Sequence, residues 1–388
     1  MTDMDCVQRS LILFLCFALV AIFVAGLLAI ATPSDALDAR VALDVPLMRW
    51  KTLGGSEDLS SLAPPRVPTG VNAVPVYRRA FAELARLDTA DRVLLNMSVL
   101  KNRRRDLGPI GSRLDAVVAV AHEAAKVSAC EWDRDFYRTG AVTMHDLSEF
   151  DQLMTLAVAI AAHAMNRAEA NDLGAALADL AVMRRMAGHA EEHPHVTQAA
   201  MGLFIDIAAL DVTERLFRDH ALPGGGAIDF SKTGDHRAAM RRTFVTHGTG
   251  CLLQLDDPDF APWGAGELVQ RDRAKVWLLD VMCDYVAALD EPGRPTVQSS
   301  VPPEGLDYAR VLVPAPSVLD LIHSAATRSD MVVAAIKLRS RRALTGDYPD
   351  SWVIPVNPDT GIVLQYRRAG GGFVLHSDTD AQLDWRWN

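Results

Sequence analysis

Apolar and polar positions follow the period of an amphipathic helix along much of the chain. Between residues 77 and 84, apolar residues recur at spacings of three, four and seven, with charged residues on the opposite side. These apolar positions are Tyr77, Ala80, Phe81 and Leu84. The pattern predicts a helix that packs one face against the rest of the protein.

The same period continues through the middle of the chain. Residues 151–170 and 173–190 are rich in Ala and Leu, and only Asn171-Asp172 separates them. So short a connection predicts an antiparallel helical hairpin. A third helix is expected at about residues 196–217. A further helical stripe is formed by Val276, Leu279, Cys283 and Val286. We expect a helical bundle or a short solenoid, although no fixed repeat is found.

The last part of the chain changes character. A helix over about residues 317–345 is expected to end at Gly346, the residue type that commonly terminates helices. Short strands are expected at residues 362–367 and 372–376, separated by a glycine-rich turn. The predicted fold class is mainly α. It combines an N-terminal transmembrane helix, an α-helical body and a small C-terminal α+β module with a two- or three-stranded antiparallel sheet.

Segments rich in Gly, Pro and Ser divide the chain at residues 54–71, 222–235 and 290–305. Together with the apolar pattern they predict five parts. These are a short cytoplasmic N-terminus (1–10), a transmembrane anchor (11–31), a post-membrane segment with a linker (32–71), an α-helical body (72–305) and the α+β module (306–388).

The anchor is predicted from an uncharged apolar run at residues 11–31. Twenty-one helical residues span about 30 Å, the thickness of the hydrocarbon core of a bilayer. The alternative is a secretory signal peptide cleaved after Ala31. The run is long for a signal peptide, and only Arg9 precedes it as a basic side chain. We therefore favour a retained single-pass anchor in a bacterial inner membrane, with the body in the periplasm.

Composition narrows the function classes. The net charge of −10 argues against a nucleic-acid partner, because binding phosphates requires a basic face. Three cysteines lie beyond the anchor, at positions 130, 251 and 283, and no Cys-x-x-Cys pair occurs. Buried thiols are expected rather than a disulfide framework or a zinc ribbon.

The order of motifs in the last 70 residues resembles the C-terminal half of major pseudopilins of type II secretion. The residues that carry the resemblance are Gly346, Tyr348, Pro349, Pro358, Gly361, Tyr366, Phe373 and Ser377. The N-terminus departs from that family, because it has no prepilin-peptidase site and lies more than 280 residues before the module. The resemblance therefore implies a protein–protein role in the envelope rather than polymerisation into a pilus.

The whole chain is similar to a group of uncharacterised bacterial membrane-anchored helical proteins. These combine an N-terminal helix, a region that starts Asn-Ala-x-x-x-Tyr-x-x-Ala, a helical middle and the same tail. The matching residues here are Asn72, Ala73, Tyr77 and Ala80.

Two groups of residues are candidate metal ligands. Asp378, Asp380 and Asp384 lie in an acidic tail, and carboxylates on a loop suit Ca²⁺. Major pseudopilins are similar in binding calcium at the corresponding loop. The alternative is a solvated acidic terminus without a metal.

His189, Glu192 and His193 match the His-x-x-Glu-His pattern of inverted zinc proteases. Helical spacing would place both imidazoles on one face, with the carboxylate as general base. However, Pro194 follows at once, and histidines near a helix C-terminus also complement the helix dipole.

Two functions remain after these observations. The first is a non-catalytic, membrane-tethered scaffold or accessory subunit of an inner-membrane or secretion-type protein complex. The second is a metal-dependent hydrolase that uses residues 189–193. The sequence contains no Gly-x-Ser-x-Gly, P-loop, Gly-x-Gly-x-x-Gly or Cys-x-x-Cys-His motif, which favours the first, and no cofactor is expected besides possible Ca²⁺.

Overall fold

The computed structural model describes residues 42–100, 108–132, 148–220, 235–257, 268–291, 297, 301–302, 312–358, 360–378 and 380–387. The predicted membrane anchor at residues 11–31 lies outside the described residues, as do most of the expected breaks at 222–235 and 290–305.

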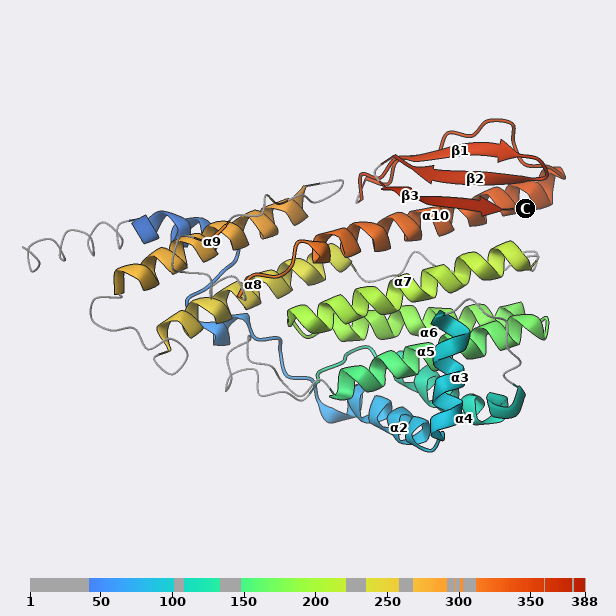
Figure 1. Cartoon of the computed structure of the whole chain (residues 1–388), viewed down its shortest axis with the longest axis horizontal. Helices are drawn as coiled ribbons and strands as arrows, with labels where there is room; N and C mark the ends of the chain where they lie inside the picture. The colour runs from blue at the N-terminus through green and yellow to red at the C-terminus, as the bar shows by residue number, and fades with distance from the viewer. Residues whose placement is uncertain are drawn as a thin grey trace, which may run out of the picture.

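The helices form successive layers of an elongated body (Figure 1). The first layer contains α2 (Val74–Ala85), α3 (Thr89–Leu100) and α4 (Gly108–Ala125). The second contains α5 (Ser148–Glu169), α6 (Leu173–Glu191) and α7 (Val196–Asp219). At the other end lie α8 (His236–Asp256), α9 (Leu268–Asp290) and a helix at residues 42–52. The long helix α10 (Ser317–Thr345) packs along α7 and carries the sheet.

The helices predicted from periodicity are confirmed. The four apolar positions of α2 are all buried. The hairpin is formed by α5 and α6, and Asn171 takes a left-handed conformation with φ of 64° in its turn. At the end of α10, Gly346 has φ of 84° and its N–H bonds to the carbonyl of Arg342 at 2.8 Å. Only glycine adopts that conformation without steric cost, which explains why the helix ends there.

The C-terminal sheet has three antiparallel strands in the order β1 (Leu364–Ala369), β2 (Gly372–Ser377) and β3 (Asp380–Trp387). The register pairs Leu364 with Ser377 and Phe373 with Trp387, and it shifts between His376 and Ser377. The three-stranded form of the prediction is therefore correct, and the third strand is made by the acidic tail.

The sheet shares its apolar core with the helical body. Trp387 stacks on Phe373 with ring centroids 5.5 Å apart, and it also meets Phe217 of α7 at 5.7 Å. The helix α10 takes part in two apolar clusters. Its first half packs with α8 and α9, and its second half packs with the first two layers and the sheet. It therefore joins the two ends of the molecule.

Residues 54–71 were expected to be a linker, and most of their backbone is indeed irregular apart from the short 3₁₀ helices Leu59–Leu62 and Thr69–Val71. They are nevertheless fixed to the body. Glu131 accepts hydrogen bonds from the Arg66 guanidinium at 2.8 Å and from the Val67 N–H at 2.5 Å. These contacts hold residues 66 and 67 against Glu131.

Among the described helices, α7 alone has the length and apolar composition to cross a membrane. More than half of its apolar stretch, 56%, is buried inside the protein. Its apolarity is thus accounted for by its central position in the helical layers.

Candidate functional site

A cleft of about 850 Å³ lies between α8, α10 and the segment that leads into β1. One wall is apolar and is supplied by α10 and by the segment at residues 352–364. Its apolar side chains include Ile322, Val333, Trp352, Ile354, Val356 and Ile362. The opposite side is charged and comes from the start of α8 and the end of α9. The cleft therefore combines an apolar surface with ionic groups, as ligand sites commonly do.

A buried charge cluster forms part of the cleft lining, at His236. Its Nδ1 lies 2.6 Å from a Glu191 oxygen, and its Nε2 lies 3.0 Å from an Asp206 oxygen. Asp206 also accepts a hydrogen bond of 2.9 Å from Arg184. Burial lowers the pKa of His236, but the two carboxylates outweigh it and raise the pKa to about 10. The imidazole is therefore a cation that donates both protons.

Local sequence explains how three helices converge on this cluster. A Cβ atom at Gly202 of α7 would lie 2.7 Å from the Ala187 carbonyl and 2.7 Å from Cγ of Glu191. The glycine thus allows α7 to approach α6 closely and leaves space for Glu191. Asp235 accepts a hydrogen bond from the Ala238 N–H and caps α8, which fixes the turn that carries His236.

Most charged groups around the cleft are used in contacts within the protein. Arg241 pairs with Asp290 at 2.9 Å. Asp330 accepts hydrogen bonds from Asn357 at 2.9 Å and from Thr360 at 2.7 Å. Lys337 differs, because it is exposed and forms no ion pair with any residue that the structure describes.

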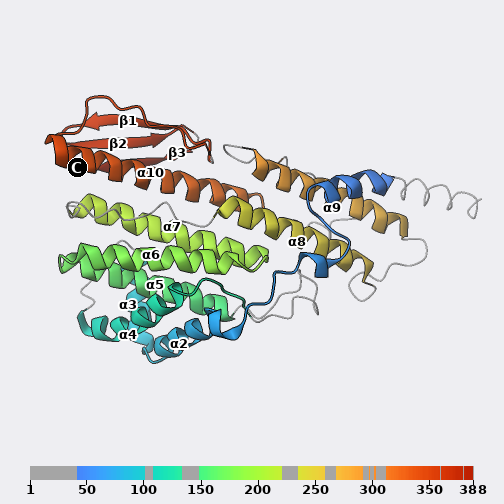
Figure 2. The same ribbon diagram turned by 180° about the vertical axis from the view of Figure 1, so that it is seen from behind.

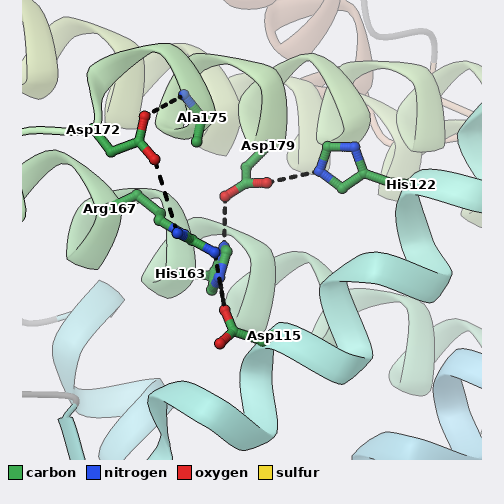
Figure 3. A network of polar contacts seen from close by, with 7 residues as sticks. All are labelled: Asp115, His122, His163, Arg167, Asp172, Ala175 and Asp179. Carbon is green, nitrogen blue, oxygen red and sulfur yellow. Dashed lines mark hydrogen bonds and ion pairs between the residues drawn. The ribbon is translucent and has the colours of Figure 1, made fainter.

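A second network joins α4, α5 and α6 (Figure 3). Asp179 is buried and accepts from His122 at 2.7 Å and from His163 at 2.6 Å. The other nitrogen of His163 donates to Asp115 at 2.8 Å, and Arg167 also reaches Asp115. Burial lowers the pKa of His163, but the two carboxylates outweigh this and the net pKa is raised. Each ring nitrogen of His163 is occupied, so the network acts as a cross-link between helices.

The His-x-x-Glu-His residues lie at the end of α6. The hydrogen bonds of His189 and Glu192 join them to other parts of the protein. His189 donates from Nε2 to the Val127 carbonyl at 3.1 Å and accepts from the Tyr77 hydroxyl at Nδ1, 2.8 Å away. Burial lowers its pKa to about 3. Glu192 accepts from the Cys130 N–H at 2.5 Å. His193 is buried. Through these contacts, His189 and Glu192 join the end of α6 to the first layer.

The candidate calcium ligands are spread over the turn after β2 and the strand β3. Asp378 accepts from the Gln365 amide at 2.6 Å, and Asp384 pairs with His376 at 2.6 Å across the two strands. Asp380 begins β3. The calcium site remains a prediction. Within the described part of the chain, no three His, Cys, Asp or Glu residues are grouped as a metal site would require.

The expected buried thiols are confirmed, because Cys130, Cys251 and Cys283 are buried and free. Four of the residues that carry the pseudopilin resemblance contact one another within the module. The Tyr366 hydroxyl donates to the Pro349 carbonyl at 2.6 Å, and Tyr348 packs edge-on against Phe373 at 4.9 Å.

Sequence reasoning missed the cleft and both histidine networks. Each histidine network left one signal in the sequence, because Asp179 and Asp206 interrupt otherwise apolar helical stretches. A carboxylate at such a position is almost never buried without a partner, so it predicts a cation on a neighbouring helix. The partners themselves lie 16 to 57 residues away along the chain and carry no local pattern.

Comparisons with protein-family models, with curated proteins and with solved structures find no match to the chain.

Proposed function

We propose that the protein is a non-catalytic scaffold or accessory subunit of an inner-membrane protein complex. Residues 11–31 tether it to the membrane, and the cleft beside α10 binds an extended, acidic segment of a partner protein of the envelope. The observation that carries the proposal is the cleft itself, where an apolar wall lies beside Lys337 and no described carboxylate pairs with that lysine. An extended segment with apolar side chains and one carboxylate complements both features.

The histidine contacts support a binding role. His163 and His236 each donate both ring protons to carboxylates, and His189 is held between a hydroxyl and a carbonyl. A general base needs a nitrogen that can reach the substrate, and in these three residues both nitrogens already have protein partners. The resemblance of the C-terminal module to major pseudopilins favours a secretion-type complex as the source of the partner.

Photo-crosslinking in the native membrane tests the proposal. A benzoylphenylalanine replaces Val356, which lines the cleft, or Val93 on α3, and both positions are 50% exposed. We expect a discrete adduct to another protein at position 356 and none at position 93. Lys337→Glu is expected to abolish the adduct and Lys337→Arg to retain it, because only the charge is needed to pair with the carboxylate.

Mass spectrometry of the adduct then identifies the attached segment. An Asp or Glu close to the crosslinked residue is expected. Equal labelling at positions 356 and 93, an adduct that survives Lys337→Glu, or an adduct between two copies of this chain would each refute the proposal.

A further inference from the structure

The helix at residues 42–52 is locked onto the end of the body that α8 and α9 form. Trp50 is fully buried, and two glycines make room for its indole ring. A Cβ atom at Gly55 would lie 2.1 Å from the ring, and one at Gly248 of α8 would lie 2.7 Å from it. Leu43 and Leu47 pack against the same apolar cluster. An aromatic side chain enclosed in this way holds the helix in one orientation.

Polar contacts hold the same helix and the residues that follow it. Arg49 pairs with Asp284 of α9 at 2.8 Å. The Thr249 hydroxyl of α8 donates to the Ser56 carbonyl at 3.0 Å. Both partners of the segment therefore belong to α8 and α9, so its direction relative to the body is fixed.

Two large apolar side chains are exposed on the outer face of this helix, beside the exposed Asp44, and nothing in the described residues covers them. Val45 is 73% exposed and Met48 is 66% exposed, and their spacing of three places them on one side of the helix. Arg49 and Lys51 follow, with side chains 46% and 53% exposed, and each forms an ion pair at 2.8 Å, Arg49 with Asp284 and Lys51 with Glu57. Apolar side chains with adjacent cations are the composition that helices use at the headgroup level of a bilayer.

The position of this face in the chain indicates what covers it. The apolar run at residues 11–31 ends ten residues before the helix begins. Ten residues reach at most about 33–36 Å when fully extended, so the helix lies close to any membrane that the run crosses.

We infer that the helix at residues 42–52 lies on the surface of that membrane, with Val45 and Met48 in the headgroup region. This inference rests on the membrane tether of the proposed function. It adds an orientation of the protein relative to the membrane, because the buried Trp50 fixes the helix to the body. The α8–α9 end then faces the bilayer, and the sheet, at the opposite end of the molecule, points away from it (Figures 1 and 2).

The experiment uses the full chain in vesicles of phosphatidylethanolamine and phosphatidylglycerol. Cys6 and Cys16 are changed to serine, and an environment-sensitive NBD dye is attached to Met48→Cys. The matched control carries the dye at Val93→Cys, an exposed apolar position on α3. We expect a blue-shifted emission at position 48. We also expect lipid-attached nitroxide to quench it several-fold more strongly than at position 93.

The outcomes separate the inference from the tether. If the protein floats with the vesicles but the dye at position 48 stays as aqueous as at position 93, the orientation is wrong and the tether stands. If both positions are quenched equally, the body lies on the membrane in another way and the inference fails. If the protein does not float, the tether of the proposed function is refuted as well.

Discussion

The buried cluster of Arg184, Asp206, His236 and Glu191 makes a quantitative prediction about stability. Asp206→Ala removes the carboxylate that both Arg184 and His236 contact, and Asp206 is fully buried. One positive charge in excess then remains among the three other groups. Removing one partner of a buried ion pair costs about 3–5 kcal/mol, because the remaining charge stays desolvated. A typical domain is stable by about 5–15 kcal/mol, so this loss is a large part of the total.

The matched control is Asp350→Ala. Asp350 pairs with Arg368 at 2.6 Å, and its side chain is 92% exposed. Solvent screens such a pair, so we expect a much smaller loss of stability than for Asp206→Ala. The two variants differ chiefly in burial, which makes the comparison a test of desolvation.

The assay is urea unfolding of the full chain in mild detergent, followed by circular dichroism and extrapolated to zero denaturant. In a thermal melt of the same variant, we expect the melting temperature to fall by about 6–20 °C, at about 2–4 °C per kcal/mol. The double variant Arg184→Met with Asp206→Leu should be more stable than Asp206→Ala, since it leaves fewer unpaired charges. Equal losses for Asp206→Ala and Asp350→Ala would refute the reasoning.

Three further predictions follow from burial and packing. Because the pKa of His163 is raised in the folded protein, its contribution is complete below the unfolded pKa and is lost as the pH rises through the folded one. The stability difference between wild type and His163→Gln should therefore be larger at pH 6 than at alkaline pH, and a constant difference would contradict this. Gly202→Ala should cost about 1–3 kcal/mol in urea unfolding through its contacts with α6, whereas Gly188→Ala, with open space around it, should stabilise α6 by up to about 1 kcal/mol. Burial raises the pKa of the three body thiols, so iodoacetamide should label them only after unfolding, and labelling of the native protein would show that they are accessible.

The helices could be predicted because their signals are local. The spacing of Tyr77, Ala80 and Phe81 is a property of one helix, and Gly346 marks the end of α10 through its own backbone preference. The third strand was harder to predict, because the acidic residues of the tail concealed the alternation that places Trp385 and Trp387 in the core.

The cleft and the charge networks could not be predicted, because their parts come from distant segments. His236 meets Asp206 and Glu191 only after α8 has folded back on α6 and α7. The His-x-x-Glu-His motif is the opposite case, because its spacing can be found in the sequence alone. It is a local pattern, but the contacts that define His189 come from Tyr77 and Val127 in another layer.

The position of Trp50 also sets the order of events while the chain is being made. Trp50 packs against Gly248, and Arg49 of the same helix pairs with Asp284, which lies 235 residues further along the sequence. The helices α5, α6 and α7 meet neighbours that are already synthesised, and such local contacts form quickly. The helix at residues 42–52 cannot complete its contacts until α9 has been synthesised, so Trp50 stays without its native partners for most of synthesis. Mutations that slow the folding of α8 or α9 should therefore expose this helix for longer to chaperones and proteases.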